Sequence, residues 1–164
     1  MTGPLCALVP AKSFTQAKSR LAAAMSPAER QALAQHLLAR TLEACLGCAT
    51  IERIYLLTTE AAGPEWAARY GVRLLRDTGA ANFATVIDHA LDELAADGGG
   101  AVCYVASDLP EVTAESLGEL VAEDGRVALK KAQAVRPALI VSDYEMPNMT
   151  GFELVHALRR DPEL

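Results

Sequence analysis

Apolar positions along the chain follow two alternating patterns. Short apolar runs occupy residues 5–9, 53–58, 72–75 and 101–106, and proline or polar residues follow them. Between these runs, apolar residues recur every three or four positions. Short apolar runs bounded by turn residues are typical of buried strands, whereas the longer spacing is typical of amphipathic helices. The pattern therefore predicts strands and helices in strict alternation.

The predicted helices have recognisable ends. Ser26-Pro27-Ala28-Glu29 has the spacing of a capping box with proline at the first helical position, so a helix is expected from there to about Gly47. Its apolar face comprises Leu33, Leu37, Thr41, Leu42 and Cys45. A short helix is expected over 64–70, and Thr113 is expected to open another. Asn82 can cap a helix that ends before the glycines at 98–100, with one face formed by Val86, Ala90, Leu91 and Leu94.

Alternating strands and helices with short connections predict an α/β fold, because parallel neighbouring strands need crossover helices. We expect a three-layer, mainly parallel, doubly wound sheet of Rossmann-like type in one compact domain over 1–164. Ligands of such sheets collect at the carboxyl ends of the strands. That rule places four polar residues on one rim, namely Lys12, Thr58, Asp77 and Asp108.

Composition narrows the classes of function. The 164 residues suit one domain, and 51% of them are hydrophobic, which excludes a disordered chain. The net charge of -6 argues against a nucleic-acid partner. No apolar run approaches the roughly 20 residues of a membrane span, and the first residues do not resemble a secretory leader. We therefore expect a cytoplasmic protein that does not engage membranes.

The segment LVPAKSFTQAKSRL carries Lys12, Lys18 and Arg20 directly after the first predicted strand. Three cations in one loop could bind a triphosphate and offset charge on a pyrophosphate leaving group. The alternative is an ordinary solvated loop. Asp108 follows the strand over 101–106, where a carboxylate could ligate magnesium, or it could simply begin a turn before Pro110. The Cys45/Cys48 pair lacks the second pair that a zinc site requires.

The same strings carry a family resemblance. LVPAKSFTQAKSRL followed by AAAMSPAERQALAQHLL, together with DTGAANFATVIDHAL and VASDLPEVTAESLGEL, resembles the 2-phospho-L-lactate (phosphoenolpyruvate) guanylyltransferases of deazaflavin-coenzyme biosynthesis. The resemblance covers residues 1–120. It implies a nucleotidyltransferase fold like that of the nucleotide-diphospho-sugar transferases. One departure is Phe83, which stands where the family usually has a Gly-Leu-Asn string.

The resemblance also implies a chemistry. A phosphate of a small phosphorylated acid would attack the α-phosphate of GTP, with Mg²⁺ assisting. By position, Lys12, Lys18 and Arg20 would hold the triphosphate, Thr58 and Asn82 would lie near the nucleoside, and Asp108 would ligate the metal.

Residues 121–164 resemble a different family, the middle of a response-regulator receiver domain, and lack the guanylyltransferase segments expected there. In receivers the aspartate that ends the third strand accepts phosphate, which corresponds to Asp143 here. The segment lacks the acidic pair, the Thr or Ser and the Lys that this chemistry also uses. Alternatively, a strand over 138–142 and a helix over 151–159 complete the sheet, and Asp143 is a second magnesium ligand.

Three functional hypotheses follow. The first is a guanylyltransferase that binds GTP, Mg²⁺ and a phosphorylated three-carbon acid, with turnover weakened because the acceptor-binding half is absent. The second is a non-catalytic chimera, natural or designed, that keeps GTP binding at most. The third is a phosphoacceptor signalling module. Oligomeric state and the identity of the acceptor stay open.

Overall fold

The structure is a computed structural model that describes residues 3–76, 83–120, 122, 124–135 and 148–161. It divides into two compact units, residues 1–115 and 116–164. The sequence-based expectation of one domain over 1–164, with segments 1–120 and 121–164, stays a prediction. The two units are described separately below.

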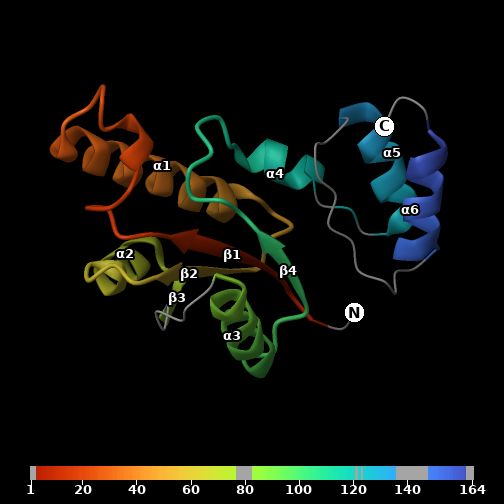
Figure 1. Ribbon diagram of the computed structural model, residues 1–164. Coiled ribbons are helices and arrows are strands. Elements are labelled where there is room, and N and C mark those ends of the chain that lie inside the picture. The colour runs from red at the N-terminus through yellow and green to blue at the C-terminus, as the bar shows by residue number, and fades with distance from the viewer. Residues whose placement is uncertain (1–2, 77–82, 121, 123, 136–147, 162–164) are drawn as a thin grey trace. The chain divides into compact units, whose positions relative to one another are not determined.

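The first unit is built on a parallel sheet (Figure 1). Its strands are β1 (Leu5–Ala11), β2 (Arg53–Thr58), β3 (Arg73–Arg76) and β4 (Ala101–Tyr104). The described strands lie in the order β3-β2-β1-β4, and every pair is parallel. The helices between them are α1 (Pro27–Gly47), α2 (Gly63–Tyr70) and α3 (Phe83–Ala96), with a short 3-10 turn, η1 (Ser19–Leu21). The predicted α/β fold class is confirmed.

Helices cover both faces of this sheet, with α1 on one side and α3 on the other (Figure 1). Strand residues alternate between the two faces. Cys6, Leu8, Tyr55 and Leu57 form one buried cluster together with Val86, Ala90 and Leu94 of α3. On the other side of the sheet, α1 buries four residues of its predicted apolar face, Leu37, Thr41, Leu42 and Cys45, and the fifth, Leu33, is partly buried. Leu91 is the exception on α3, since it lies about 100° around the helix from Ala90 and is exposed.

The ends of three strands differ from the prediction, and the smallest difference is in β3, which is predicted over 72–75 and lies at Arg73–Arg76. β1 continues through Pro10 to Ala11, although proline cannot donate to a sheet. It is tolerated because pairing with β4 stops at Leu8, so Pro10 has a strand partner on only one side, at Leu57. β4 ends at Tyr104 rather than at residue 106, and the amide of Val105 still donates to the carbonyl of Leu8.

The start of α1 is as the sequence predicted. The Ser26 hydroxyl accepts from the amide of Glu29 at 3.3 Å, and the Glu29 carboxylate accepts from the amide of Ser26 at 2.8 Å. These reciprocal bonds satisfy amide groups that would otherwise lack partners at the helix start. Because α1 begins there, the segment between β1 and α1 has a fixed length, residues 12–26.

The strand order has a consequence for binding. The chain proceeds from β1 outward to β2 and β3, and then returns to the other side of β1 to form β4. The crevice between β1 and β4 is therefore a topological switch point, where doubly wound sheets bind their ligands at the carboxyl ends of the strands. The loops that leave these two strands contain Lys12 and Lys18 on one side and Asp108 on the other.

The second unit contains most of α4 (Ala114–Leu120), together with α5 (Gly125–Val135) and α6 (Gly151–Arg160). The α5 and α6 helices pack together, and Ala132 and Leu154 are buried. Thr150 and Glu153 form a capping box at the start of α6. The predicted helix over 151–159 is thus confirmed, one residue longer. The predicted strand over 138–142 lies outside the described residues.

Candidate functional site

An ion pair joins the two loops at the switch point. The Nζ atom of Lys18 lies 2.9 Å from Oδ2 of Asp108, which is 90 residues away in sequence. Lys18 follows β1 and Asp108 follows β4. The Lys18 side chain is 22% exposed and the Asp108 side chain 59% exposed, so both remain accessible to a ligand. A cation and a carboxylate are thus held together at the switch point, where doubly wound sheets bind their ligands.

The backbone of Lys18 is in the left-handed region, with φ 55° and ψ 35°. This conformation is unfavourable for a residue with a side chain such as lysine. In the described residues it is shared by one other non-glycine residue, Asn148. Lys18 immediately precedes η1, whose second residue is Arg20. The left-handed turn therefore sets the direction in which the chain leaves Lys18 towards Arg20.

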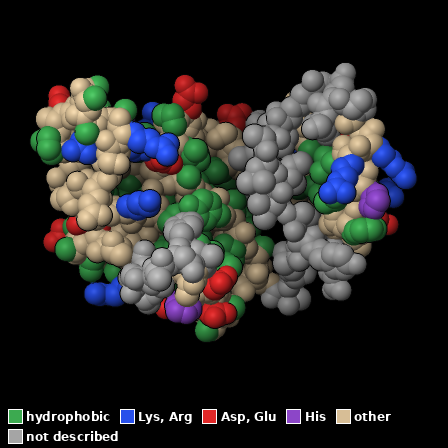
Figure 2. All heavy atoms as spheres, in the orientation of Figure 1, with side chains coloured by type: hydrophobic (Ala, Val, Ile, Leu, Met, Phe, Trp, Pro, Cys, Tyr) green, Lys and Arg blue, Asp and Glu red, His purple; other side chains and the backbone are tan. Residues whose placement is uncertain are grey.

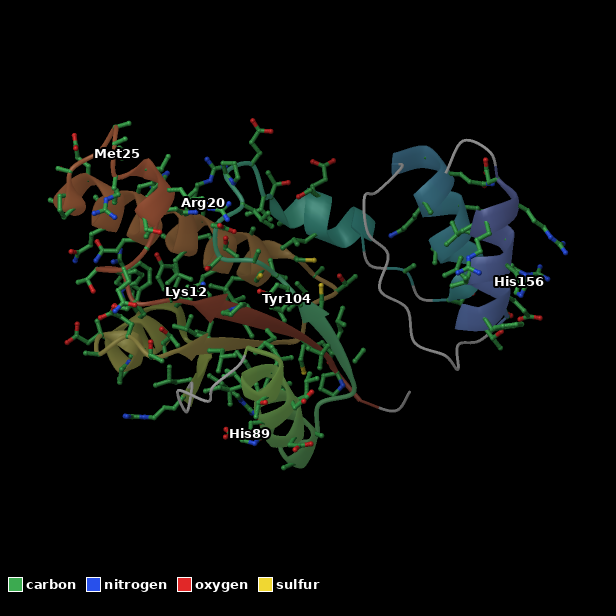
Figure 3. All side chains as sticks on the ribbon, in the orientation of Figure 1. Lys12, Arg20, Met25, His89, Tyr104 and His156 are labelled. Atoms are coloured by element: carbon green, nitrogen blue, oxygen red, sulfur yellow. The ribbon has the colours of Figure 1, made fainter. Side chains whose placement is uncertain are left out.

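The other two predicted cations lie on the same loop. Lys12 directly follows β1 and is exposed, and Arg20 is exposed in η1. Figure 3 shows Lys12 and Tyr104 near the ends of neighbouring strands, with Arg20 closer to α1. In Figure 2, Lys and Arg side chains occupy the visible surface in this part of the molecule. The loop thus presents positive charge in a chain whose net charge is negative.

Thr58, at the end of β2, is 5% exposed and is one of two buried polar residues described. Its Oγ1 accepts a hydrogen bond from the amide of Glu60 at 3.0 Å. It also lines a small cavity of about 170 Å³ at the ends of β2 and β3, with Thr59, Glu60, Ala61, Pro64, Leu74 and Arg76. The threonine predicted near the nucleoside therefore lies on the expected rim, with its hydroxyl engaged by the neighbouring turn.

Glu60 is a residue that the sequence analysis missed. Its Oε2 accepts hydrogen bonds from the amide of Phe14 at 2.7 Å and from the hydroxyl of Ser13 at 3.1 Å. It therefore ties the loop after β1 to the turn after β2, across 46 residues. The one signal available was its position two residues beyond a predicted strand, on the rim where ligands bind.

Tyr104 ends β4 beside the ion pair. Burial, together with the negative charge of Asp108, raises the pKa of the Tyr104 phenol. The ring is nevertheless half exposed. Tyr104 therefore brings an aromatic surface to the switch point, in its neutral form at neutral pH.

Cys6, Cys45 and Cys48 are buried thiols, Cys103 is partly buried, and none of the cysteines described forms a disulfide. Burial raises the pKa of Cys45 to about 12, and it also raises the pKa values of Cys6 and Cys103. Thiols with raised pKa values are weak nucleophiles and poor metal ligands. Within the described ranges, no group of three or more His, Cys, Asp or Glu side chains could hold a metal ion.

Asp77, Asn82 and Asp143 lie outside the described residues, so their roles stay predictions. The structure brings Lys18 and Asp108 together, Lys12 and Thr58 lie at the carboxyl ends of β1 and β2, and Arg20 lies in η1. His36, His89 and His156 are exposed on three different helices. Among the described residues, no helix is long and apolar enough to cross a membrane.

Comparison with known proteins identifies the family. A family model described as "Guanylyl transferase CofC like" matches residues 5–136. The chain belongs to this family. The match of the CofC-like chain continues past residue 120, where the sequence analysis placed the change of family.

Three curated relatives are similar to this CofC-like chain. It is 33% identical over 116 residues to the phosphoenolpyruvate guanylyltransferase of Sphaerobacter thermophilus, covering 71% of this chain and 56% of the relative. It is 30% identical over 168 aligned positions to the phosphoenolpyruvate guanylyltransferase of Rubrobacter xylanophilus, covering 94% and 80%. A 2-phospho-L-lactate guanylyltransferase of Methanothermobacter thermautotrophicus is 26% identical, covering 79% and 56%. In two of these three comparisons the chain therefore spans about half of the relative's length.

Two further similarities concern the fold and a short segment. A solved structure from Desulfovibrio desulfuricans G20, assigned as a nucleotide-diphospho-sugar transferase, has a TM-score of 0.60, 18% identity and coverage of 71% of this chain and 52% of the other. It supports the α/β fold. Separately, 42 residues of the chain are 50% identical to Histidine kinase P4 of Formosa agariphila, over 26% of this chain and 3% of that protein.

Proposed function

We propose that this protein binds GTP with Mg²⁺ and transfers the guanylyl group to a small phosphorylated three-carbon acid, phosphoenolpyruvate or 2-phospho-L-lactate. Membership of the CofC-like family and the names of the relatives support this reaction class. The observation that carries the proposal is the Lys18–Asp108 pair. It joins the segment over 12–26, called the basic loop below, to a carboxylate across the switch point between β1 and β4.

In this proposal the basic loop binds the triphosphate. Lys18 and Lys12 supply compact charges for phosphate oxygens, and Arg20 can engage two oxygens at once. All three follow β1, so they approach the nucleotide from one side of the crevice. Their charge would offset the charge that builds up on pyrophosphate as it leaves. Thr58 and Asn82 are proposed to lie near the nucleoside.

The residues present fit a magnesium ion. Asp108 offers one carboxylate, more than half exposed, at the end of β4. Mg²⁺ is commonly held by one or two carboxylates together with substrate phosphate oxygens, so one carboxylate is a sufficient protein contribution. When bound, the ion would neutralise charge on the phosphates. Asp143 is proposed as a second carboxylate, and magnesium affinity that is unchanged in Asp143→Asn would refute that assignment.

The test combines two measurements on the whole chain. Calorimetry with GTP and Mg²⁺ should show binding, and GTP with phosphoenolpyruvate or 2-phospho-L-lactate should release pyrophosphate. Asp108→Asn should weaken magnesium-dependent binding at least tenfold, while Asp92→Asn, an exposed residue of α3, is the matched control and should bind as the wild type does. Absence of GTP binding by the wild type would overturn the proposal.

A second candidate is a non-catalytic chimera that binds GTP without turnover. The 50% identity of a 42-residue stretch to Histidine kinase P4 favours it. The acceptor-binding part would then be replaced by a receiver-like segment, and orientation of the attacking phosphate would be lost. Binding without pyrophosphate release would support this candidate. Labelling of Asp143 by a small acyl phosphate would instead support a phosphoacceptor module.

A further inference from the structure

The turn after β2 holds the basic loop at Ser13 and Phe14, which lie between Lys12 and Lys18 in sequence. Glu60 Oε2 accepts the Phe14 amide at 2.7 Å and the Ser13 hydroxyl at 3.1 Å, while Oε1 accepts the amide of Ala61 at 3.1 Å. Hydrogen bonds to an ionised acceptor are shorter and stronger than neutral ones. Glu60 thus fixes the backbone of the loop midway between two of its cations.

The side chain of Phe14 is also held. The Phe14 ring is 5% exposed and packs against Trp66 of α2, with ring centroids 5.4 Å apart and planes tilted by 54°. Trp66 in turn stacks on Tyr70, with centroids 5.7 Å apart. Aromatic pairs at these separations add to the free energy gained from burial. The backbone of Phe14 is therefore hydrogen-bonded to Glu60, and its ring packs against Trp66.

Glu60 is itself fixed by the end of β2. The amide of Glu60 donates to Oγ1 of Thr58, whose buried hydroxyl belongs to the sheet. The connection thus runs from a rigid strand through Thr58 and Glu60 to the basic loop. Charged groups that bind a ligand need such support, because small displacements weaken binding and catalysis.

We infer that Glu60 and Trp66 are positioning residues for the basic loop, and we name the pair the loop clamp. The inference rests on the proposed function, because it assigns the loop to the triphosphate. Glu60 carries a negative charge on the same rim as the proposed triphosphate site, so its charge alone would weaken binding of the nucleotide. Its benefit to binding must therefore come from holding Phe14 and, through it, the cations.

The charge of Glu60 and its positioning role predict opposite effects on GTP affinity, so removing its side chain tests which effect is larger. Calorimetry with GTP and Mg²⁺ is carried out on the full-length wild type and on Glu60→Ala, with Glu65→Ala as the control. Glu65 is an exposed carboxylate in the first turn of α2, five residues along the chain. Both variants lose one negative charge. We expect Glu60→Ala to weaken GTP binding about tenfold, or about 1.4 kcal/mol, and Glu65→Ala to bind equally or more tightly.

A second ligand separates positioning from a general loss of structure. GMP lacks the β- and γ-phosphates, so Glu60→Ala should bind it within about twofold of the wild type, whereas general damage would weaken both ligands. Glu60→Gln keeps an oxygen acceptor for the Phe14 amide and should recover part of the GTP affinity. It also serves as the test variant should Glu60→Ala fail to fold.

The outcomes are distinguishable. A wild type that binds no GTP would overturn the proposed function and, with it, this inference. A wild type that binds GTP, together with Glu60 variants of equal or higher GTP affinity, would overturn the loop clamp alone. Equal losses for GTP and GMP would also overturn it.

Discussion

Lys18 combines an unfavourable backbone with an exposed functional group. Its left-handed conformation costs a non-glycine residue roughly 1 kcal/mol, and asparagine tolerates that conformation better than lysine does. Its ion pair with Asp108 is partly exposed, and such pairs contribute about 0–1 kcal/mol. Stability therefore gives little reason for a lysine at this position, whereas triphosphate binding does.

Replacing Lys18 by asparagine should separate these contributions. The backbone relief and the lost ion pair have opposite signs, so the free energy of unfolding should change by less than about 1 kcal/mol. GTP affinity should fall tenfold or more, because one cation of the loop is gone. Denaturant unfolding and calorimetry measure the two effects. Unchanged GTP affinity would remove Lys18 from the proposed site.

For single residues, the sequence predicted where a side chain lies in the fold better than it predicted which distant residue the side chain contacts. The sequence assigned Asp108 to the rim and Lys18 to the loop after the first predicted strand, and the structure brings the two side chains together. Glu60 was missed because its role is a contact with Phe14 made across 46 residues. Local spacing carries no information about such a partner.

Among the elements, α1 has a start that is defined by neighbouring residues alone. Ser26 and Glu29 are three residues apart, and their reciprocal hydrogen bonds involve no other part of the chain. The side chain of Ser26, followed by its amide, lowers the pKa of the Glu29 carboxyl below its ordinary value of 4.5. The ionised form of Glu29 is thus the form that the folded helix prefers.

This gives α1 a pH dependence with a definite sign. Because the pKa of Glu29 is lower in the folded state, its contribution is present above the unfolded pKa of about 4.5 and is lost as pH falls through the folded value. The wild type should therefore melt above Glu29→Gln at pH 7, and the gap should close towards pH 3. Thermal unfolding at both pH values measures it. Glu43→Gln, which removes a carboxylate from the same helix away from its start, is the control.

In the first unit, the parallel direction of the strands separates two rims with different chemistry. At the carboxyl ends lie Lys12, Lys18 and Asp108. At the opposite end, Asp97 accepts from the Tyr55 hydroxyl and pairs with Arg73, in a network that joins α3 to the sheet. The first rim is proposed to bind nucleotide, and the second contributes to stability.

Nucleotide binding should therefore perturb one end of the sheet. On addition of GTP and Mg²⁺, backbone amide NMR shifts should change most at Lys12, Lys18 and Asp108. The amides of Arg53 and Asp97 should change little, because Arg53 is the first residue of β2 and its side chain donates to the carbonyl of Asp97 at that end of the sheet. Larger changes at the second rim would place the nucleotide elsewhere and contradict the proposed site.

Sequence by itself determined what depends on neighbours along the chain. The alternation of apolar runs and helical spacing predicted the parallel α/β fold, and Ser26 and Glu29 predicted the start of α1. Tertiary structure alone decided the strand order, the Lys18–Asp108 pair and the contacts of Glu60 and Trp66 with Phe14. The physical reason is that a cap or an apolar period is satisfied within a few residues. An ion pair or a ring contact depends instead on which strands lie side by side.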